Sequence, residues 1–249
     1  MDAHDLISDY FDEIYPHDSY AEELDPIKRD VLQRVIRNYQ EKKIRVLDIC
    51  TGTGRALGVF DSDDTFELTG IDISSKLIVK AREKYKTARF VQCDALHLAD
   101  AFDGELFDCI LISGVSLQLF APQKRITIFS QVKELLCNGG ALYFDIFLDM
   151  LKERKALIKL STSRSNEEIL VVYRREPSVP SMPWKQHVDL FRKEIGSNRW
   201  TGLTNTVYIY NVTLDEIRNE IKSTGLKLTD FKLKREHTIF LKAVKDAES

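Results

Sequence analysis

The stretch from Val46 to Gly54, Val-Leu-Asp-Ile-Cys-Thr-Gly-Thr-Gly, joins an apolar run to a glycine-rich turn. The run from Ile44 to Ile49 predicts a short buried strand, and we expect a helix after the turn. Glycines in such a turn let a ligand approach the backbone closely and leave helix N–H groups free to face it. We therefore expect a ligand-binding turn at the carboxyl end of this strand.

Strand and helix patterns alternate around that turn. Apolar runs predict four further strands, over residues 66–71, 89–93, 107–112 and 141–147. Helices are expected from Pro26 to about Tyr39, after the N-cap Ser74, and from Ile126 to Leu136, where Asn138-Gly139-Gly140 is typical of a C-cap and turn. The alternation predicts a parallel, doubly wound α/β sheet.

The pattern changes after Phe147. Apolar and polar residues alternate over 169–174, 187–194 and 206–212, as in half-exposed antiparallel strands, and the proline-rich segment 177–183 predicts a loop. Residues 213–216, Thr-Leu-Asp-Glu, form a capping-box pattern that opens a helix ending near Gly225. Closing strands are expected over 226–233 and 238–244, so the α/β core is predicted to carry an antiparallel insert of roughly 60 residues.

The glycine spacing narrows the choice of ligand. The dinucleotide pattern Gly-x-Gly-x-x-Gly fails because Leu57 stands at its third glycine, and no Lys follows Gly54 as a phosphate-binding loop would require. Two acids follow the next strands instead. Asp72 is placed to accept both hydroxyls of a ribose, and Asp94 to accept a hydrogen bond from an adenine amine. The alternative is that both acids are helix caps or solvated turn residues.

With these residues the chain resembles class I S-adenosylmethionine-dependent methyltransferases over residues 45–147, and its closing elements over 213–244 fit the family's last helix and hairpin. Asp48-x-x-x-Gly52-x-Gly54 looks like the family's first motif, Asp72 like its ribose acid and Asp94 like its adenine-side acid. Cys50 stands where the family usually has a third glycine.

The resemblance implies an α/β, doubly wound, seven-stranded Rossmann-like methyltransferase fold with an antiparallel insert after strand five. It also implies S-adenosylmethionine as cofactor and S-adenosylhomocysteine as product. We expect an N-terminal lid over 1–25, a cofactor-binding core over 26–150, the substrate-side insert over 151–212, and the closing helix and hairpin over 213–249. The cofactor-binding residues implied are Asp48, Cys50, Thr51, Gly52, Gly54, Asp72, Ile73, Asp94, Ala95 and Ser113.

Nucleic acid is not expected as the acceptor. Residues 113–116, Ser-Gly-Val-Ser, replace the Asn/Asp-Pro-Pro-Tyr/Phe motif of relatives that methylate base amines, and no Cys follows a Pro as in relatives that attack pyrimidine C5. The charges nearly cancel, with 36 Lys and Arg against 39 Asp and Glu, whereas nucleic-acid binders are usually basic.

The N-terminal residues 9–15, with Tyr20 beyond them, resemble the tyrosine-rich lid of glycine/sarcosine and amino-sugar N-methyltransferases. The alternative is an amphipathic helix whose rings pack on the core. Tyr10 and His187 are the candidate catalytic residues. Tyr10 belongs to the stretch that resembles the lid, and the imidazole of a histidine titrates near neutrality. The candidate acceptor-side residues, some of which could enclose a methylammonium group by cation–π contact, are Tyr15, Tyr20, Arg174, Trp184, Trp200 and Tyr208.

Composition supports a cytoplasmic protein without a metal centre. The four cysteines form no Cys-x-x-Cys pair and are expected to be reduced and mostly buried, so neither a disulfide framework nor a zinc site is predicted. No apolar run is long enough to span a membrane, and the acidic N-terminal segment lacks the features of a secretory signal. A monomer and a homodimer both remain open.

The sequence therefore predicts a methyltransferase that moves a methyl group to an N or O atom of a small molecule by in-line displacement. Three alternatives stay open: a nicotinamide-dependent reductase, a catalytically silent cofactor-binding regulatory subunit, and a methyltransferase acting on a macromolecule. The failed dinucleotide spacing weighs against the reductase.

Overall fold

The chain forms two units. The computed structural model describes residues 8–14, 20–36, 42–147, 157–164, 166–176, 183–234 and 238–245 of the 249. Contacts divide the chain into one unit of residues 17–148 and 212–249, hereafter the core, and another of residues 1–16 and 149–211, hereafter the insert unit.

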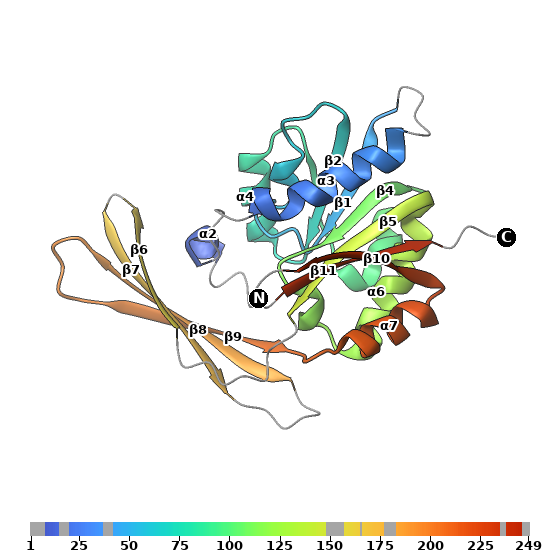
Figure 1. The fold of residues 1–249 in the computed structure, drawn as a ribbon. Helices are drawn as coiled ribbons and strands as arrows, with labels where there is room; N and C mark the ends of the chain where they lie inside the picture. Colours follow the sequence, from blue (N-terminus) through green and yellow to red (C-terminus); the bar gives the residue numbers. More distant parts are fainter. Residues whose placement is uncertain are drawn as a thin grey trace. The chain divides into compact units, whose positions relative to one another are not determined.

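The core is built on a mixed seven-stranded sheet in the order β10-β11-β5-β4-β1-β2-β3 (Figure 1). Strands β1 to β5 run parallel, and β11 is antiparallel to both of its neighbours, β5 and β10. The bounds are β1 Ile44–Ile49, β2 Phe66–Asp72, β3 Arg89–Gln92, β4 Phe107–Ile112, β5 Leu136–Phe147, β10 Leu226–Lys234 and β11 Thr238–Lys245. The predicted doubly wound sheet with a closing hairpin is confirmed.

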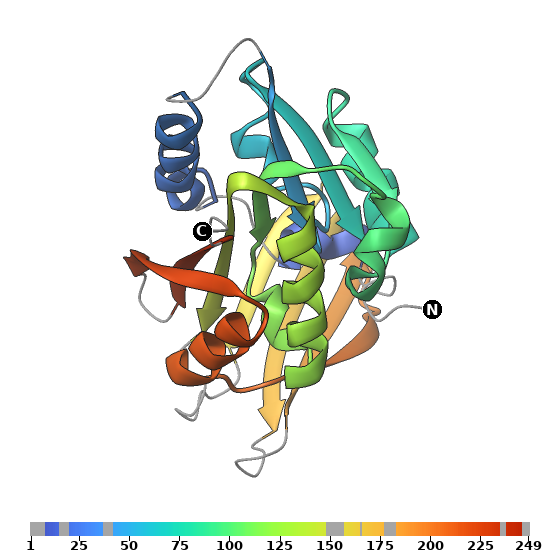
Figure 2. The same ribbon diagram turned by 90° about the vertical axis from the view of Figure 1, so that its right-hand side faces the viewer.

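Helices cover both faces of this sheet (Figures 1 and 2). Apolar side chains of α3 (Tyr20–Ile36), η2 (Leu57–Val59) and α4 (Ser75–Lys84) pack in one buried cluster. Those of η3 (Ala95–His97), α5 (Leu98–Ala101), η4 (Ser116–Leu119), α6 (Pro122–Leu135) and α7 (Leu214–Ser223) pack in the cluster on the other face. Because both faces are covered, the central strands are apolar almost throughout.

The helix-start signals in the sequence are confirmed where they are local. Ser74 caps α4 by accepting a hydrogen bond from Leu77 N at 3.2 Å. Thr213 and Glu216 form the complete capping box at the start of α7. Both caps satisfy backbone N–H groups that lack partners within their own helix.

Several sequence-based boundaries are wrong, among them those of β9, which spans Thr201–Ile209 rather than 206–212. Helix α3 begins at Tyr20, six residues before the predicted start at Pro26, which lies inside it, and α6 begins at Pro122 rather than Ile126. Asn138-Gly139-Gly140 does not cap a helix. The chain passes from α6 into β5 at Leu136, and these residues lie where the β4–β5 register shifts, with Gly139 at φ +80°. The positive φ of Gly139 allows the backbone to form an irregularity of the β-bulge type in β5.

The insert unit holds a four-stranded antiparallel sheet in the order β6-β7-β8-β9 (Figure 1). Its strands are β6 Leu157–Arg164, β7 Glu167–Glu176, β8 Trp184–Glu194 and β9 Thr201–Ile209, of which β6 was not predicted from the sequence. The short elements η1 (Ser8–Tyr10) and α2 (Phe11–Ile14) pack on this sheet. Their buried residues, Tyr10 and Ile14, contact an apolar cluster made of Ile169, Val171, Val188 and Leu190.

Candidate active site

The glycine-rich turn after β1 has a left-handed backbone at three positions. Cys50 has φ +60°, Gly52 φ +58° and Gly54 φ +83°. Hydrogen bonds from Thr51 N to Ile71 O at 2.8 Å and from Gly54 N to Thr51 O at 2.9 Å hold the turn. The turn is thus fixed against the end of β2 before any ligand binds.

Cys50 adopts the conformation that the missing glycine would adopt without strain. A left-handed backbone costs a residue with a Cβ on the order of 1–2 kcal/mol. Cysteine in place of glycine therefore leaves the shape of the turn intact but strains the backbone at residue 50. Residues with strained backbone conformations cluster at functional sites.

Asp48 lies buried at the start of this turn. Its Oδ2 accepts a hydrogen bond from Thr51 Oγ1 at 2.6 Å, whereas its Oδ1 is buried without a hydrogen-bond partner. Burial raises the pKa of Asp48 to about 7; the Thr51 hydrogen bond opposes this shift and the charge of Asp72 adds to it. A buried acceptor without a partner is costly, and a donor from a ligand would satisfy it.

Asp72 connects the ends of β1 and β2. Its Oδ2 accepts a hydrogen bond from Gly52 N at 2.9 Å, and its Oδ1 accepts one from Ser74 N at 2.9 Å. A carboxylate at the end of a parallel strand is a group that can accept ligand hydroxyls. The suggestion that Asp72 is a helix cap does not hold, because Ser74 caps α4.

Asp94 has the structural role that the alternative assigned to it. It is the N-cap of η3 and accepts a hydrogen bond from Leu96 N at 2.9 Å through Oδ1. The same side chain is half-buried. Capping through one oxygen is compatible with an adenine contact through the other, and that contact stays a prediction.

The predicted cofactor residues gather at one edge of the core sheet. The register pairs Asp48 with both Gly70 and Leu111, so the chain segments after β1, β2 and β4 leave the sheet side by side. Cys93 N donates to Asp72 O at 3.0 Å and brings the end of β3 to the same place. Ile73 is 47% exposed there, a large apolar surface beside the acids.

Two residues at this edge were not predicted from the sequence. Asp145 on β5 is 5% exposed and accepts a hydrogen bond from Val115 N at 2.8 Å. Burial raises the pKa of Asp145 to about 7, although backbone N–H groups oppose the shift. Val115 has φ +63°. An acid inside an apolar strand was the available signal, but its partner could not be read from the sequence.

The candidate acceptor-side residues of the insert lie on different faces of its sheet. In the β8–β9 register Trp184 pairs with Ile209 and Lys185 with Tyr208, so Trp184 and Tyr208 point to opposite faces. Trp184 is buried and its indole N–H has no partner, whereas Tyr208 is 51% exposed. Within this sheet the two rings therefore cannot belong to one aromatic box.

His187 and Arg174 lie on the same face as Tyr208, and both have partners. His187 Nδ1 is 2.8 Å from Thr206 Oγ1 and its Nε2 is 3.1 Å from Glu176 Oε1. Arg174 Nε lies 2.5 Å from Asp189 Oδ2, and this bond holds the pKa of Asp189 below its usual range.

Tyr10 has a buried ring and a bonded hydroxyl. The hydroxyl donates to Glu167 Oε2 at 3.2 Å and accepts from Arg192 Nη1 at 2.6 Å. The packing alternative for the N-terminal tyrosines thus describes the surroundings of Tyr10 within the insert unit. Tyr15 lies outside the described residues, as does the side chain of Tyr20.

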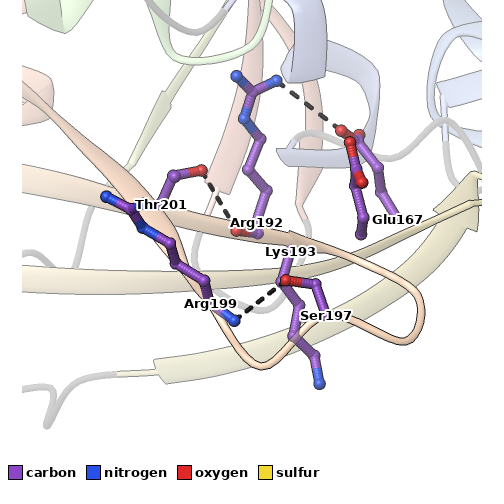
Figure 3. Close-up of a pocket in the computed structure, with 7 residues that line it drawn as sticks. Glu167, Arg192, Lys193, Ser197, Arg199 and Thr201 are labelled. Atoms are coloured by element: carbon purple, nitrogen blue, oxygen red, sulfur yellow. Dashed lines mark hydrogen bonds and ion pairs between the residues drawn. The ribbon is translucent and has the colours of Figure 1, made fainter.

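A hollow of about 290 Å³ lies at the β8–β9 hairpin and is shown in Figure 3. Its cations are largely paired: Arg192 Nη1 lies 3.8 Å from Glu167 Oε1 and Lys193 Nζ lies 2.9 Å from Glu168 Oε2. Lys193 also covers the exposed ring of Trp200 at 5.1 Å. The lining residues are Glu167, Arg192, Lys193, Glu194, Ser197, Arg199 and Thr201, and none of them is a predicted acceptor-side residue.

The part of the chain that the structure describes was predicted to hold no metal centre and no membrane-spanning segment. Three or more His, Cys, Asp or Glu side chains do not gather there as metal ligands would. In the same part of the chain, the helices are all too short or too polar to cross a membrane.

The residues that form this edge of the sheet match a known protein family. The family described as "Methyltransferase domain" matches residues 46–140, which run from β1 into β5 and include the glycine turn, Asp72 and Asp94. Residues 46–140 form a methyltransferase domain of the class I, S-adenosylmethionine-dependent type.

Relatives of this methyltransferase are distant. The Campylobacter jejuni ubiquinone/menaquinone biosynthesis C-methyltransferase UbiE is 26% identical over 167 residues, which are 62% of this chain and 68% of that protein. Two solved structures show the same fold. CalS10, an amino pentose methyltransferase from Micromonospora echinaspora, has a TM-score of 0.75 at 14% identity and covers 94% of this chain and 96% of its own. An S-adenosylmethionine-dependent methyltransferase from Clostridium acetobutylicum has a TM-score of 0.74 at 14% identity. This match covers 97% of this chain and 98% of the Clostridium protein.

The methyltransferase edge fits its cofactor, S-adenosylmethionine, in the chemistry of its donors and acceptors. The cofactor carries an ammonium group, ribose hydroxyls and an adenine amine, all of which donate hydrogen bonds. The edge supplies the carboxyl groups of Asp48, Asp72 and Asp94, and one oxygen of Asp48 is buried there without a partner. Carboxylates that accept such donors form strong, charge-assisted bonds with the cation.

Proposed function

We propose that this methyltransferase transfers a methyl group from S-adenosylmethionine to an N or O atom of a small-molecule acceptor. One observation carries the proposal: Asp72 accepts a hydrogen bond from Gly52 N at 2.9 Å, so that the glycine turn and the ribose-type acid form one rigid unit at the carboxyl ends of β1 and β2. Ligands of open α/β sheets bind at such ends.

In this proposal the polar groups of S-adenosylmethionine bind at the ends of three strands, β1, β2 and β3. Asp72 is proposed to accept the ribose hydroxyls, Asp94 the adenine amine, and Asp48 with the 50–54 turn the methionine end. When bound, S-adenosylmethionine supplies an electrophilic methyl group on a sulfonium. The task of the protein is then to hold the nucleophile in line with that methyl group and to exclude water.

The insert supports a small acceptor with an amine group. CalS10, an amino pentose methyltransferase, has the same fold over 94% of this chain. An amine acceptor has to reach its neutral form before it can attack the methyl group. Because CalS10 is an amino pentose methyltransferase, an N-methyl product is the first outcome to seek and an O-methyl product the second.

Tyr10 and His187 are proposed to serve the acceptor side, and their contacts define a test of that role. Tyr10→Phe keeps the ring in its apolar cluster and removes the hydroxyl bonded to Arg192 and Glu167. His187→Gln keeps a side chain able to bond Thr206 and removes the imidazole ring. A loss of turnover with unchanged thermal stability in either variant supports a catalytic role; unchanged turnover refutes it for that residue.

The decisive experiment is a release assay for S-adenosylhomocysteine with a panel of acceptors. The panel contains amino sugars, glycine, sarcosine, hydroxylated sugars, phenols and hydroquinones as small molecules, and protein and RNA as macromolecules. We expect product with an amine or hydroxyl acceptor, with mass spectrometry locating the new methyl group on N or O. Asp72→Ala is the matched variant in which the rate must fall.

Other outcomes separate the alternatives. Methylation of carbon in a hydroquinone would replace the N or O proposal with the chemistry of the curated relative. Cofactor binding without product across small molecules, proteins and RNA would indicate a silent regulatory subunit. Product with protein or RNA alone would indicate a macromolecular substrate.

A further inference from the structure

The turn after β4 is strained. Gly114 has φ +72° and Val115 has φ +63°, so two consecutive residues are left-handed. A β-branched residue in this region is a genuine outlier, because its side chain crowds the backbone. Such strain persists only where the surrounding structure enforces the conformation.

Asp145 supplies that enforcement from β5. Its Oδ1 accepts a hydrogen bond from Val115 N at 2.8 Å. The parallel register pairs Ile112 with Phe144, which places the residue after β4, Ser113, beside Asp145. The bond therefore ties the strained residue to the neighbouring strand.

The rest of the turn is tied down by further bonds. Ser116 Oγ donates to Ser113 O at 2.7 Å, and Gln118 N donates to Val115 O at 3.0 Å. Gln118 Oε1 accepts from Phe147 N at 2.7 Å, at the end of β5. These bonds hold the carbonyl groups of Ser113 and Val115, whereas the carboxylate of Asp145 is the group that holds the Val115 N–H.

The position of this turn connects it to the cofactor edge. Asp48 pairs with Leu111, so the chain after β4 runs beside the glycine turn, and Ser113 is a predicted cofactor residue. Asp145 is nearly fully buried, and the groups that oppose the rise in its pKa are backbone N–H groups.

We propose that Asp145 is a positioning residue for the cofactor: its carboxylate holds Val115 in the left-handed conformation and so sets the Ser113–Ser116 turn against the methionine end of S-adenosylmethionine. This inference rests on the proposed cofactor site. It makes Asp145 part of the binding apparatus through Val115, with no contact to the reacting atoms required.

A double-mutant cycle tests the proposal. Asp145→Leu removes the acceptor and keeps an apolar side chain of similar size, whereas Val115→Gly removes the strain, because glycine adopts a positive φ freely. We expect Asp145→Leu to weaken S-adenosylhomocysteine binding about tenfold in calorimetry, which corresponds to about 1.4 kcal/mol. In the Val115→Gly background the same change is expected to cost less than about threefold.

Hydrogen exchange supplies a readout that needs neither acceptor nor turnover. The amides of residues 113–117 are expected to exchange faster in Asp145→Leu and to regain protection when S-adenosylhomocysteine is added to the double variant. Asp145→Asn keeps an acceptor oxygen for Val115 N, so it is expected to bind like the wild type; weakened binding in Asp145→Asn would show that the acceptor oxygen alone does not hold the turn.

The matched control is Asp108→Leu. Asp108 also accepts a backbone N–H bond, from Arg45 at 2.9 Å, but at the opposite end of β4. Its substitution is expected to leave cofactor affinity unchanged. Equal losses in Asp145→Leu with and without Val115→Gly, or unchanged affinity in Asp145→Leu, would overturn the positioning role. Failure of the wild type to bind S-adenosylhomocysteine would instead reject the proposed cofactor site.

Discussion

The carboxylate of Asp72 accepts a hydrogen bond from the backbone N–H of Gly52 at 2.9 Å, across 20 residues of sequence. The bond fixes the glycine turn after β1 to the end of β2. Two features that the sequence shows separately, a turn and an acid, are therefore one structural unit, and a change in either one alters both.

Asp72→Ala should weaken S-adenosylhomocysteine binding by about 1–3 kcal/mol, because ligand hydroxyls and the Gly52 N–H lose a charged acceptor. Calorimetric titration measures the change. Asp64→Ala is the control, since Asp64 is exposed in the turn before β2. An affinity equal to that of the wild type would remove Asp72 from the proposed site.

Cys50→Gly should raise the free energy of unfolding by up to about 1 kcal/mol. Glycine relieves the left-handed strain at φ +60°, and the greater freedom of the unfolded chain offsets part of the gain. Urea unfolding followed by circular dichroism measures it. Cys93→Gly makes the same chemical change at a residue outside the positive-φ set and should be destabilising; destabilisation by both variants would contradict the strain argument.

Arg125→Met should destabilise the core by about 3–5 kcal/mol, since it leaves a buried carboxylate unpaired. Arg125 on α6 is 1% exposed, and its Nε donates to Glu220 Oε2 on α7 at 2.8 Å. Adding Glu220→Leu should recover most of the loss. Denaturant midpoints of the two single variants and the double variant decide the matter, and a double variant no more stable than Arg125→Met would show that the charge is not the cause.

The stability of the wild type relative to Asp48→Asn should fall as the pH rises from about 4 towards about 7. Burial raises the pKa of Asp48 in the folded state to about 7, so the folded state holds a proton there that the unfolded state has released. Raising the pH therefore favours unfolding of the wild type and leaves the neutral Asn unaffected. Urea unfolding of both proteins at pH 5 and pH 8 gives the comparison, in which other titrating groups cancel. A difference independent of pH would mean that Asp48 ionises normally.

Much of the core follows from local pattern. The apolar run before the glycine turn, the Ser74 cap and the Thr213–Glu216 capping box each depend on neighbouring residues, and each is present as predicted. Signals that compete locally were misleading. Pro26 lies inside α3, and Asn138-Gly139-Gly140 forms a bulge in β5 because tertiary packing there continues the strand.

What the sequence by itself determined is the α/β core, the glycine turn at the end of its first strand and the acids at the ends of the next two, because periodicity and spacing act within a few residues. The tertiary structure alone decided that Asp145 holds Val115, that Arg125 meets Glu220 and that Tyr10 is buried against the insert sheet. These partners lie 30, 95 and more than 150 residues apart in the chain. Contacts at such separations form only when the cooperative burial of apolar surface outweighs the entropy of closing long loops, and no local pattern encodes which residues will then meet.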